Sequence, residues 1–260
     1  MFKNNYVALW LLLASALAII LFVAFFDDIS IGNYTIRKAP VAETLSARSS
    51  DILPPPVEST DSVTAVSDTV PTDTVPQNFL IFGDSMTYNL ALRLAQYAKQ
   101  NGHTIHAVNW DSSNTLIWAE SDTLEYYIRK FRPTQIFISL GSNELYLKDP
   151  ERRRTYVRRI LGVIDTVPYV WIGPPNWTKD SGLNDMIASE CRRGAFFRSE
   201  GMEFQRKADK VHPTRASSAL WIDSIMRWIP KSAHPFRAEI PSDSIGKANP
   251  NIIFLKALNK

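Results

Sequence analysis

The chain has 260 residues, of which 45% are hydrophobic, and its 29 Lys and Arg against 26 Asp and Glu give a net charge of +3. This composition excludes a wholly disordered chain and a protein with many membrane spans. The single cysteine, Cys191, excludes an internal disulfide framework and a cysteine-rich zinc cluster. Composition divides the chain into three regions, at residues 1–39, 40–78 and 79–260.

The first region contains an uninterrupted apolar run from residue 6 to residue 26. These 21 residues carry no charge, and at about 1.5 Å per residue they are long enough to cross a bilayer. A cleaved signal peptide is the alternative, but its apolar part is usually about 7–15 residues and ends in a small-x-small site. Here the run ends in Phe-Phe-Asp-Asp. We therefore predict an uncleaved single-pass anchor in the lipid bilayer, with the rest of the chain on the extracytoplasmic side (periplasm or cell surface).

The second region, residues 40–78, has the composition of a tether. Its 39 residues include six Pro and twelve Ser or Thr, and they lack Gly, Trp, Tyr and Phe. Such a segment cannot bury enough apolar surface to offset the entropy lost on ordering. We predict a disordered linker. Residues 1–39 carry a net charge of +1 and the linker one of −5, which leaves +7 of the total for residues 79–260.

The third region alternates short apolar runs with amphipathic stretches. Predicted strands lie at 78–82, 104–108, 135–140 and 168–172, with a short one near 202–205. Predicted helices cover 90–101, 124–131, 152–164, 181–198 and 214–228. This alternation predicts an α/β fold with a parallel sheet covered on both faces. Ligand sites in such sheets lie at the carboxyl ends of the strands.

Three polar segments fall at or near those strand ends. Ser85 follows the first strand, where its hydroxyl would be exposed at a helix N-terminus whose positive potential favours an oxyanion. Asn143 follows the third strand, where its side-chain N–H can also stabilise an oxyanion. Asp209 and His212 precede the last helix and can pair as an orienting carboxylate and a general base. Taken singly, each segment is better explained by a helix cap, a turn or a solvated surface.

Together and in this order, the three segments resemble the SGNH/GDSL hydrolase family. The matching motifs are Gly-Asp-Ser at 83–85, Gly-Ser-Asn-Glu at 141–144 and Asp-x-Val-His-Pro at 209–213. The resemblance covers roughly residues 79–230. It implies a three-layer, flavodoxin-like fold and esterase or acyl-transfer activity. It also implies that Ser85 is the nucleophile, His212 the base and Asp209 its orienting partner, and it requires no metal or organic cofactor.

The oxyanion hole implied by the resemblance consists of Asn143 and the backbone N–H of Ser85, with one further donor. The family's second motif normally supplies that donor from a glycine. In this chain Ser113 stands at that position. A serine still has a backbone N–H, but its Cβ crowds the site or changes the backbone angle.

Four further residues are expected at the substrate, namely Asp84, Trp110, Asn114 and Trp177. The two tryptophans could stack on a sugar ring, although core packing is the more common role of a Trp on such a loop. The arginines at 152–154 and 158–159 follow the polar face of an amphipathic helix. The sequence contains no nucleic-acid-binding motif.

These observations lead to three functional hypotheses. The first is a membrane-anchored serine esterase that removes an acyl group, most plausibly acetyl, from a cell-envelope glycan or another small ester. The second is an O-acyltransferase that uses the same residues and works with an integral membrane acyl-donor protein. The third is a catalytically weak glycan-binding or scaffold protein, which the missing glycine favours.

Overall fold

The computed structural model describes residues 28–31, 34–37 and 71–256. The first two ranges form an antiparallel pair of strands, β1 (Asp28–Ile31) and β2 (Tyr34–Arg37). The predicted anchor at 6–26 and most of the predicted linker lie outside the described residues. Within those described ranges, no helix combines the length and the apolar character needed to span a bilayer.

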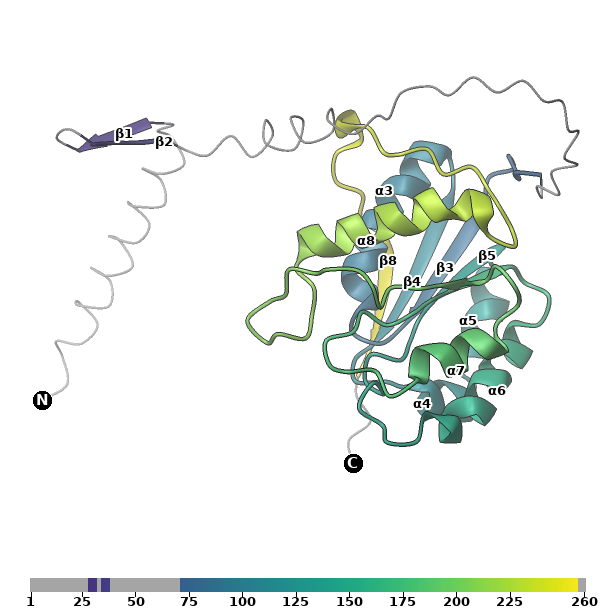
Figure 1. Ribbon diagram of the computed structural model, residues 1–260. Helices are drawn as coiled ribbons and strands as arrows, with labels where there is room; N and C mark the ends of the chain where they lie inside the picture. Colours follow the sequence, from purple (N-terminus) through teal and green to yellow (C-terminus); the bar gives the residue numbers. More distant parts are fainter. Residues whose placement is uncertain (1–27, 32–33, 38–70, 257–260) are drawn as a thin grey trace, which may run out of the picture. The chain divides into compact units, whose positions relative to one another are not determined.

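The larger unit is built on a six-stranded sheet in which all neighbouring strands are parallel (Figure 1). Its strands are β3 (Asn78–Gly83), β4 (Thr104–Trp110), β5 (Gln135–Ser139), β6 (Tyr169–Ile172), β7 (Phe196–Phe197) and β8 (Asn251–Leu255). The order across the sheet is β7-β6-β5-β3-β4-β8. The first five strands follow the order of flavodoxin-like sheets, so the topological switch point lies between β3 and β5.

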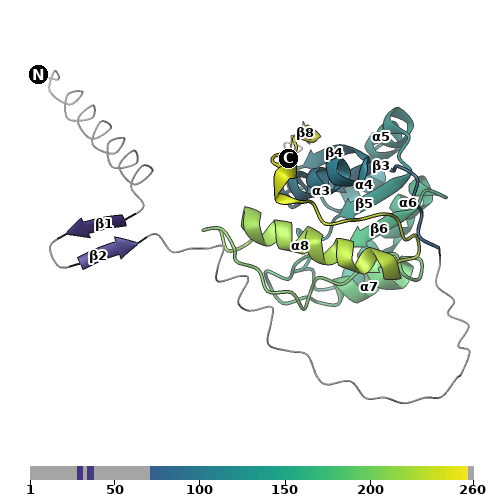
Figure 2. The same cartoon turned by 90° about the horizontal axis from the view of Figure 1, so that it is seen from above.

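Helices cover both faces of this sheet, which makes three layers (Figure 2). One face carries α3 (Thr87–Asn101) and α8 (Arg215–Trp228). The other carries α4 (Thr115–Glu120), α5 (Thr123–Phe131), α6 (Arg154–Ile164) and α7 (Leu183–Glu190). Short 3₁₀ turns occur at η1 (Pro150–Arg153), η2 (Ile229–Lys231) and η3 (Asp243–Ile245). The predicted α/β class is confirmed.

The central position of β3 in the sheet explains why its residues 79–82 are all apolar. Phe79 and Ile81 belong to the core under α3 and α8, whereas Leu80 and Phe82 belong to the core under α4–α7. Successive side chains of a strand point to opposite faces. A central strand with helices on both sides therefore has no polar face, and all four side chains are fully buried.

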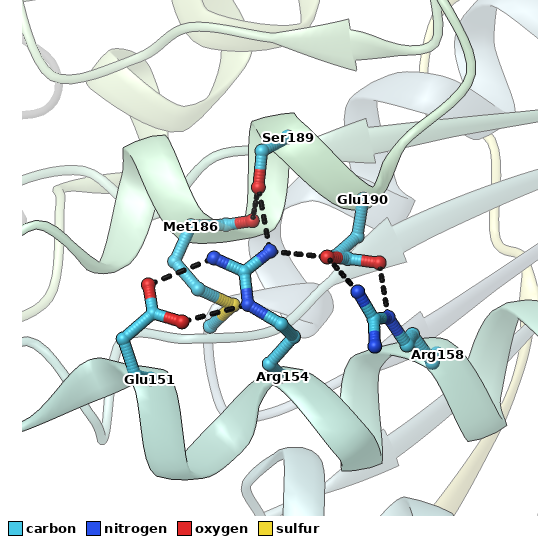
Figure 3. A network of polar contacts seen from close by, with 6 residues as sticks. All are labelled: Glu151, Arg154, Arg158, Met186, Ser189 and Glu190. Atoms are coloured by element: carbon cyan, nitrogen blue, oxygen red, sulfur yellow. Dashed lines mark hydrogen bonds and ion pairs between the residues drawn. The ribbon is translucent and has the colours of Figure 1, made fainter.

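The arginine-rich helix α6 buries the predicted apolar stripe, with Val157, Ile160 and Ile164 in the core. Two of its arginines contact the carboxylate of Glu190 on α7 (Figure 3). The Arg158 Nε–Glu190 Oε2 distance is 2.7 Å. These arginines therefore connect two helices of one layer.

The structure differs from the sequence-based expectations at three elements. The helix predicted over 181–198 ends at Glu190, and β7 follows it. A turn at Gly194, with a φ of 77°, redirects the chain, and Ala195 then accepts a hydrogen bond from the Trp171 N–H. The predicted strand near 202–205 is absent from the described residues; this stretch is a loop, and its Phe204 ring packs against Trp221. Helix α4 was not predicted.

Two segments outside the predicted strands and helices belong to this unit. The apolar residues near the C-terminus form β8, which pairs with β4 and completes the sheet. Residues 71–78, which composition assigned to the linker, also contact the domain. Asp73 pairs with Phe236, and the Gln77 backbone N–H donates to His103 Nδ1 at 2.9 Å. The folded unit therefore begins before the predicted boundary at residue 79.

Replacing Glu190 with glutamine should lower the melting temperature, because one carboxylate serves two guanidinium groups. The Arg158 and Arg154 guanidinium groups hold the pKa of Glu190 below its usual value of 4.5. A depressed pKa means that this contribution is present above pH 4.5 and is lost as the pH falls through the lowered pKa. The measurement is the melting temperature of the wild type and the variant at a series of pH values above and below 4.5, and their difference should shrink as the pH falls. The exposed Glu125–Arg129 pair supplies the control, Glu125→Gln, which should change the melting temperature less.

Candidate active site

The turn after β3 places Ser85 at the carboxyl edge of the sheet, just before α3. Gly83 makes this turn compatible with close pairing to β5. A Cβ at Gly83 would lie 1.9 Å from the Ser139 carbonyl oxygen, which no other residue could tolerate. The next residue, Asp84, donates its backbone N–H to the same carbonyl at 2.9 Å. Ser85 therefore leaves the sheet at the topological switch point.

His212 and Asp209 approach Ser85 from the loop before α8. The Ser85 Oγ lies 2.8 Å from His212 Nε2, and His212 Nδ1 lies 2.9 Å from Asp209 Oδ2. The other carboxylate oxygen, Asp209 Oδ1, accepts the backbone N–H groups of Val211 and His212, both at 2.9 Å. The structure thus joins residues 127 positions apart in the sequence into one hydrogen-bonded chain.

The electrostatics of this chain fix which nitrogen of His212 carries the proton. The backbone N–H groups of His212 and Val211, followed by the imidazole itself, lower the pKa of Asp209 to about 2. The ionised carboxylate can only accept, so the proton of a neutral imidazole sits on Nδ1. The lone pair of Nε2 then faces the Ser85 hydroxyl, which is the arrangement of a general base and its nucleophile.

Asn143 lies in the turn after β5, on the other side of the switch point from Ser85. Its Nδ2 donates to the carbonyl oxygen of Ser113 at 2.9 Å. That bond uses one of the two amide hydrogens and fixes the orientation of the amide plane. In the described part of the chain, no group accepts the backbone N–H of Ser85. These two donors are available to an oxyanion.

Ser113 plays a different part from the one expected. Its backbone N–H donates to the Trp110 carbonyl at 3.1 Å, and its buried Oγ accepts the indole N–H of Trp118 at 2.9 Å. The preceding Ser112 has a φ of 60°, which turns the Ser113 N–H back toward Trp110. The N–H proposed as a third oxyanion donor is therefore engaged inside a turn, while the Ser113 carbonyl orients Asn143.

Asp84 was expected at the substrate, but it is fully buried. Its Oδ1 accepts the Met86 N–H at 3.0 Å and its Oδ2 accepts the Ser142 N–H at 3.2 Å. Burial raises the pKa of this carboxyl to about 7, against the lowering effect of those two donors. The expectation of substrate contact is wrong because Asp84 points into the protein, where it joins the turns that hold Ser85 and Asn143.

A second buried carboxylate, Glu144, supports the same region. It accepts the Thr115 backbone N–H at 2.9 Å and the Thr115 hydroxyl at 2.8 Å, and it pairs with Arg153 Nε at 2.8 Å. Glu144 thereby fixes the start of α4 and the turn after β5 relative to each other. No role was predicted for it; the only sequence signal is a carboxylate placed directly after Asn143.

The remaining predicted substrate residues differ in position. Trp110 is buried, packs edge-on against Trp118 and donates its indole N–H to the Lys256 carbonyl, which is the core-packing role rather than that of an exposed stacking surface. Asn114 is the N-cap of α4, and its Oδ1 accepts the Ile117 N–H at 3.0 Å. Trp177 is half-buried and donates its indole N–H to the Ser142 carbonyl at 2.9 Å, which places it beside the turn that carries Asn143.

In residues 28–31, 34–37 and 71–256, no group of three His, Cys, Asp or Glu side chains is placed to hold a metal ion. No protein-family model matches the chain, and no curated protein matches it. The assignment of function therefore depends on the geometry of the site and on the motifs that carry it.

Replacing Asp209 with asparagine should remove an acid-sensitive contribution to stability. The pKa of Asp209 is depressed from 3.8 to about 2 in the folded protein. The stabilisation is therefore present above pH 3.8 and is lost as the pH falls toward 2. Urea unfolding between pH 2 and 6 should show the wild type approaching the variant as the pH falls. A constant difference over that range would contradict the assigned hydrogen bonds.

Proposed function

We propose that this protein is a serine esterase of the SGNH/GDSL type. The observation that carries the proposal is the hydrogen-bonded chain from Ser85 through His212 to Asp209, with contacts of 2.8 and 2.9 Å. It occurs at the switch point of a flavodoxin-like sheet, where ligands bind in such folds. The order of the motifs along the chain supports the same family.

In the proposed mechanism, the Ser85 hydroxyl attacks the carbonyl carbon of an ester and its proton moves to His212 Nε2. The tetrahedral intermediate collapses, the C–O bond to the alcohol breaks, and the alcohol leaves with the proton from His212. Water then attacks the acyl-enzyme and gives its proton to the same nitrogen. Release of the acid returns the proton to Ser85. Asp209 stays ionised and holds the imidazole in orientation.

The oxyanion would form between the turns after β3 and β5. The backbone N–H of Ser85 and the free amide hydrogen of Asn143 are its donors. Helix α3, whose 15 residues begin two positions after Ser85, adds the positive potential of its N-terminus. Because Ser113 already holds the amide of Asn143, the donor needs little reorganisation when charge develops.

We propose an acyl ester, most plausibly acetyl, on an extracytoplasmic cell-envelope glycan as the substrate. The apolar run at 6–26 and the proline-rich segment after it support a reaction near a membrane surface. Transfer to a sugar hydroxyl, with a membrane acyl-donor protein as partner, differs only in the acceptor that resolves the acyl-enzyme. The scaffold hypothesis is less favoured, because Ser85 and His212 lie within hydrogen-bonding distance.

Substituting Ser85 with alanine should reduce hydrolysis of p-nitrophenyl acetate by at least about 10³-fold, because the variant has no nucleophile. The measurement is steady-state turnover by the full chain in detergent micelles. Ser244→Ala, in the exposed turn η3, is the control and should keep wild-type turnover. A folded wild type that neither turns over the ester nor reacts with a serine-directed phosphonate would refute the esterase assignment.

Substituting Asn143 with alanine should lower kcat for the same ester by about 10²–10³-fold, because a donor to the oxyanion is lost. KM should change much less, since the ground-state carbonyl carries little charge. Circular dichroism would verify that the variant is folded. An unchanged kcat would exclude Asn143 from the oxyanion hole.

A further inference from the structure

Two exposed aromatic side chains contact each other beside the candidate active site. Tyr88, in the first turn of α3, is 40% exposed, and Phe254, on β8, is 59% exposed. Their ring centroids are 5.8 Å apart and the ring planes are inclined by 43°. The two rings form a contiguous exposed apolar surface, and larger surfaces of this kind mark sites of ligand binding or interaction.

The register of the sheet places this pair at the catalytic edge. Gly83 on β3 pairs with Asn109 on β4, and Asn109 pairs with Phe254 on β8. Strand β8 is the edge strand next to β4 (Figure 1). Ser85 follows Gly83 by two residues and Tyr88 follows Ser85 by three. The aromatic pair therefore flanks the nucleophile on the β4–β8 side.

The position of Tyr88 is fixed by a buried amide. Its backbone N–H donates to Oδ1 of Asn109 at 3.1 Å, and Asn109 is only 1% exposed. The Nδ2 of Asn109 donates to the exposed carboxylate of Asp111 at 2.7 Å. The Tyr88–Phe254 surface is thus held in place by Asn109, and the Asp111 carboxylate on the following loop is a hydrogen-bond acceptor next to it.

We propose that Tyr88 and Phe254 form a platform on which a sugar ring of the substrate lies while its ester reaches Ser85. The apolar C–H face of a sugar packs against aromatic rings, and its hydroxyl groups need polar partners such as the Asp111 carboxylate. The inference rests on the proposed esterase function and adds the residues that select a glycan ester over a simple one.

A second aromatic surface gives the test a matched control. A pocket of about 450 Å³ is lined by Trp110, Tyr126, Tyr127 and Leu255, together with the polar residues Asp122, Thr123 and Lys256. Tyr126 is 50% exposed and belongs to α5, on the opposite layer from α3. If a sugar binds there instead, Tyr126 and not Tyr88 will determine selectivity.

The experiment compares glucose 6-acetate, which keeps its other hydroxyl groups free, with p-nitrophenyl acetate as substrates of the full chain in detergent micelles. The ratio of kcat/KM for the sugar ester to that for the simple ester should fall about tenfold in Tyr88→Ala and in Phe254→Ala, mainly through KM. Tyr88→Phe, which keeps the ring, should retain the wild-type ratio, and so should Tyr126→Ala.

Three results would overturn the platform: an unchanged ratio in Tyr88→Ala and Phe254→Ala, an equal loss on both esters, or a fall in the ratio in Tyr126→Ala alone. If the wild type hydrolyses neither ester, the proposed function fails, and saturation-transfer NMR then tests the platform separately. Glucose 6-acetate should bind to Ser85→Ala and lose that binding when Tyr88→Ala is added. Absence of binding to Ser85→Ala would refute the platform as well.

Discussion

The buried carboxylate of Asp84 joins the two turns on which the candidate site depends. Its two oxygens accept N–H groups from Met86 and from Ser142, which lie on either side of the switch point between β3 and β5. Ser85 and Asn143 are the neighbours of these groups in sequence. Because an unpaired buried N–H or carboxyl is costly, the turns are held where both groups are satisfied, and the nucleophile and the amide donor keep their relative position.

Further hydrogen bonds around this junction position the other residues of the site. Glu144 fixes the start of α4, and the Ser113 carbonyl then orients the amide of Asn143. His212 comes from a different loop, where the carboxylate of Asp209 holds both its ring and its backbone N–H. Each residue that would touch the ester is thus positioned by a second polar group, an arrangement that favours catalysis by preorganisation.

Much of the fold could be predicted because its signals are local. Short apolar runs next to amphipathic stretches predicted β3, β4, β5 and β6 and most of the helices. The exceptions depend on tertiary contacts. Strand β7 forms because the backbone N–H groups of Trp171 and Gly173 donate hydrogen bonds to the carbonyls of Ala195 and Phe197. Two phenylalanines after a helix do not by themselves predict a strand. The sequence left open whether Trp110 packs in the core or stacks on a sugar, because the Lys256 carbonyl that accepts its indole N–H is 146 positions away in the chain.

The sequence by itself determined the α/β class and named Ser85, Asn143, Asp209 and His212, because strand periodicity and short motifs are local properties. Only the tertiary structure decided that Ser85 and His212 lie 2.8 Å apart, that Asp84 faces inward, and that the Ser113 N–H is engaged. The physical reason is that hydrogen-bond partners and burial depend on which turns meet at the edge of the sheet. Which turns come together is set by the strand order, which pairs residues far apart in the chain.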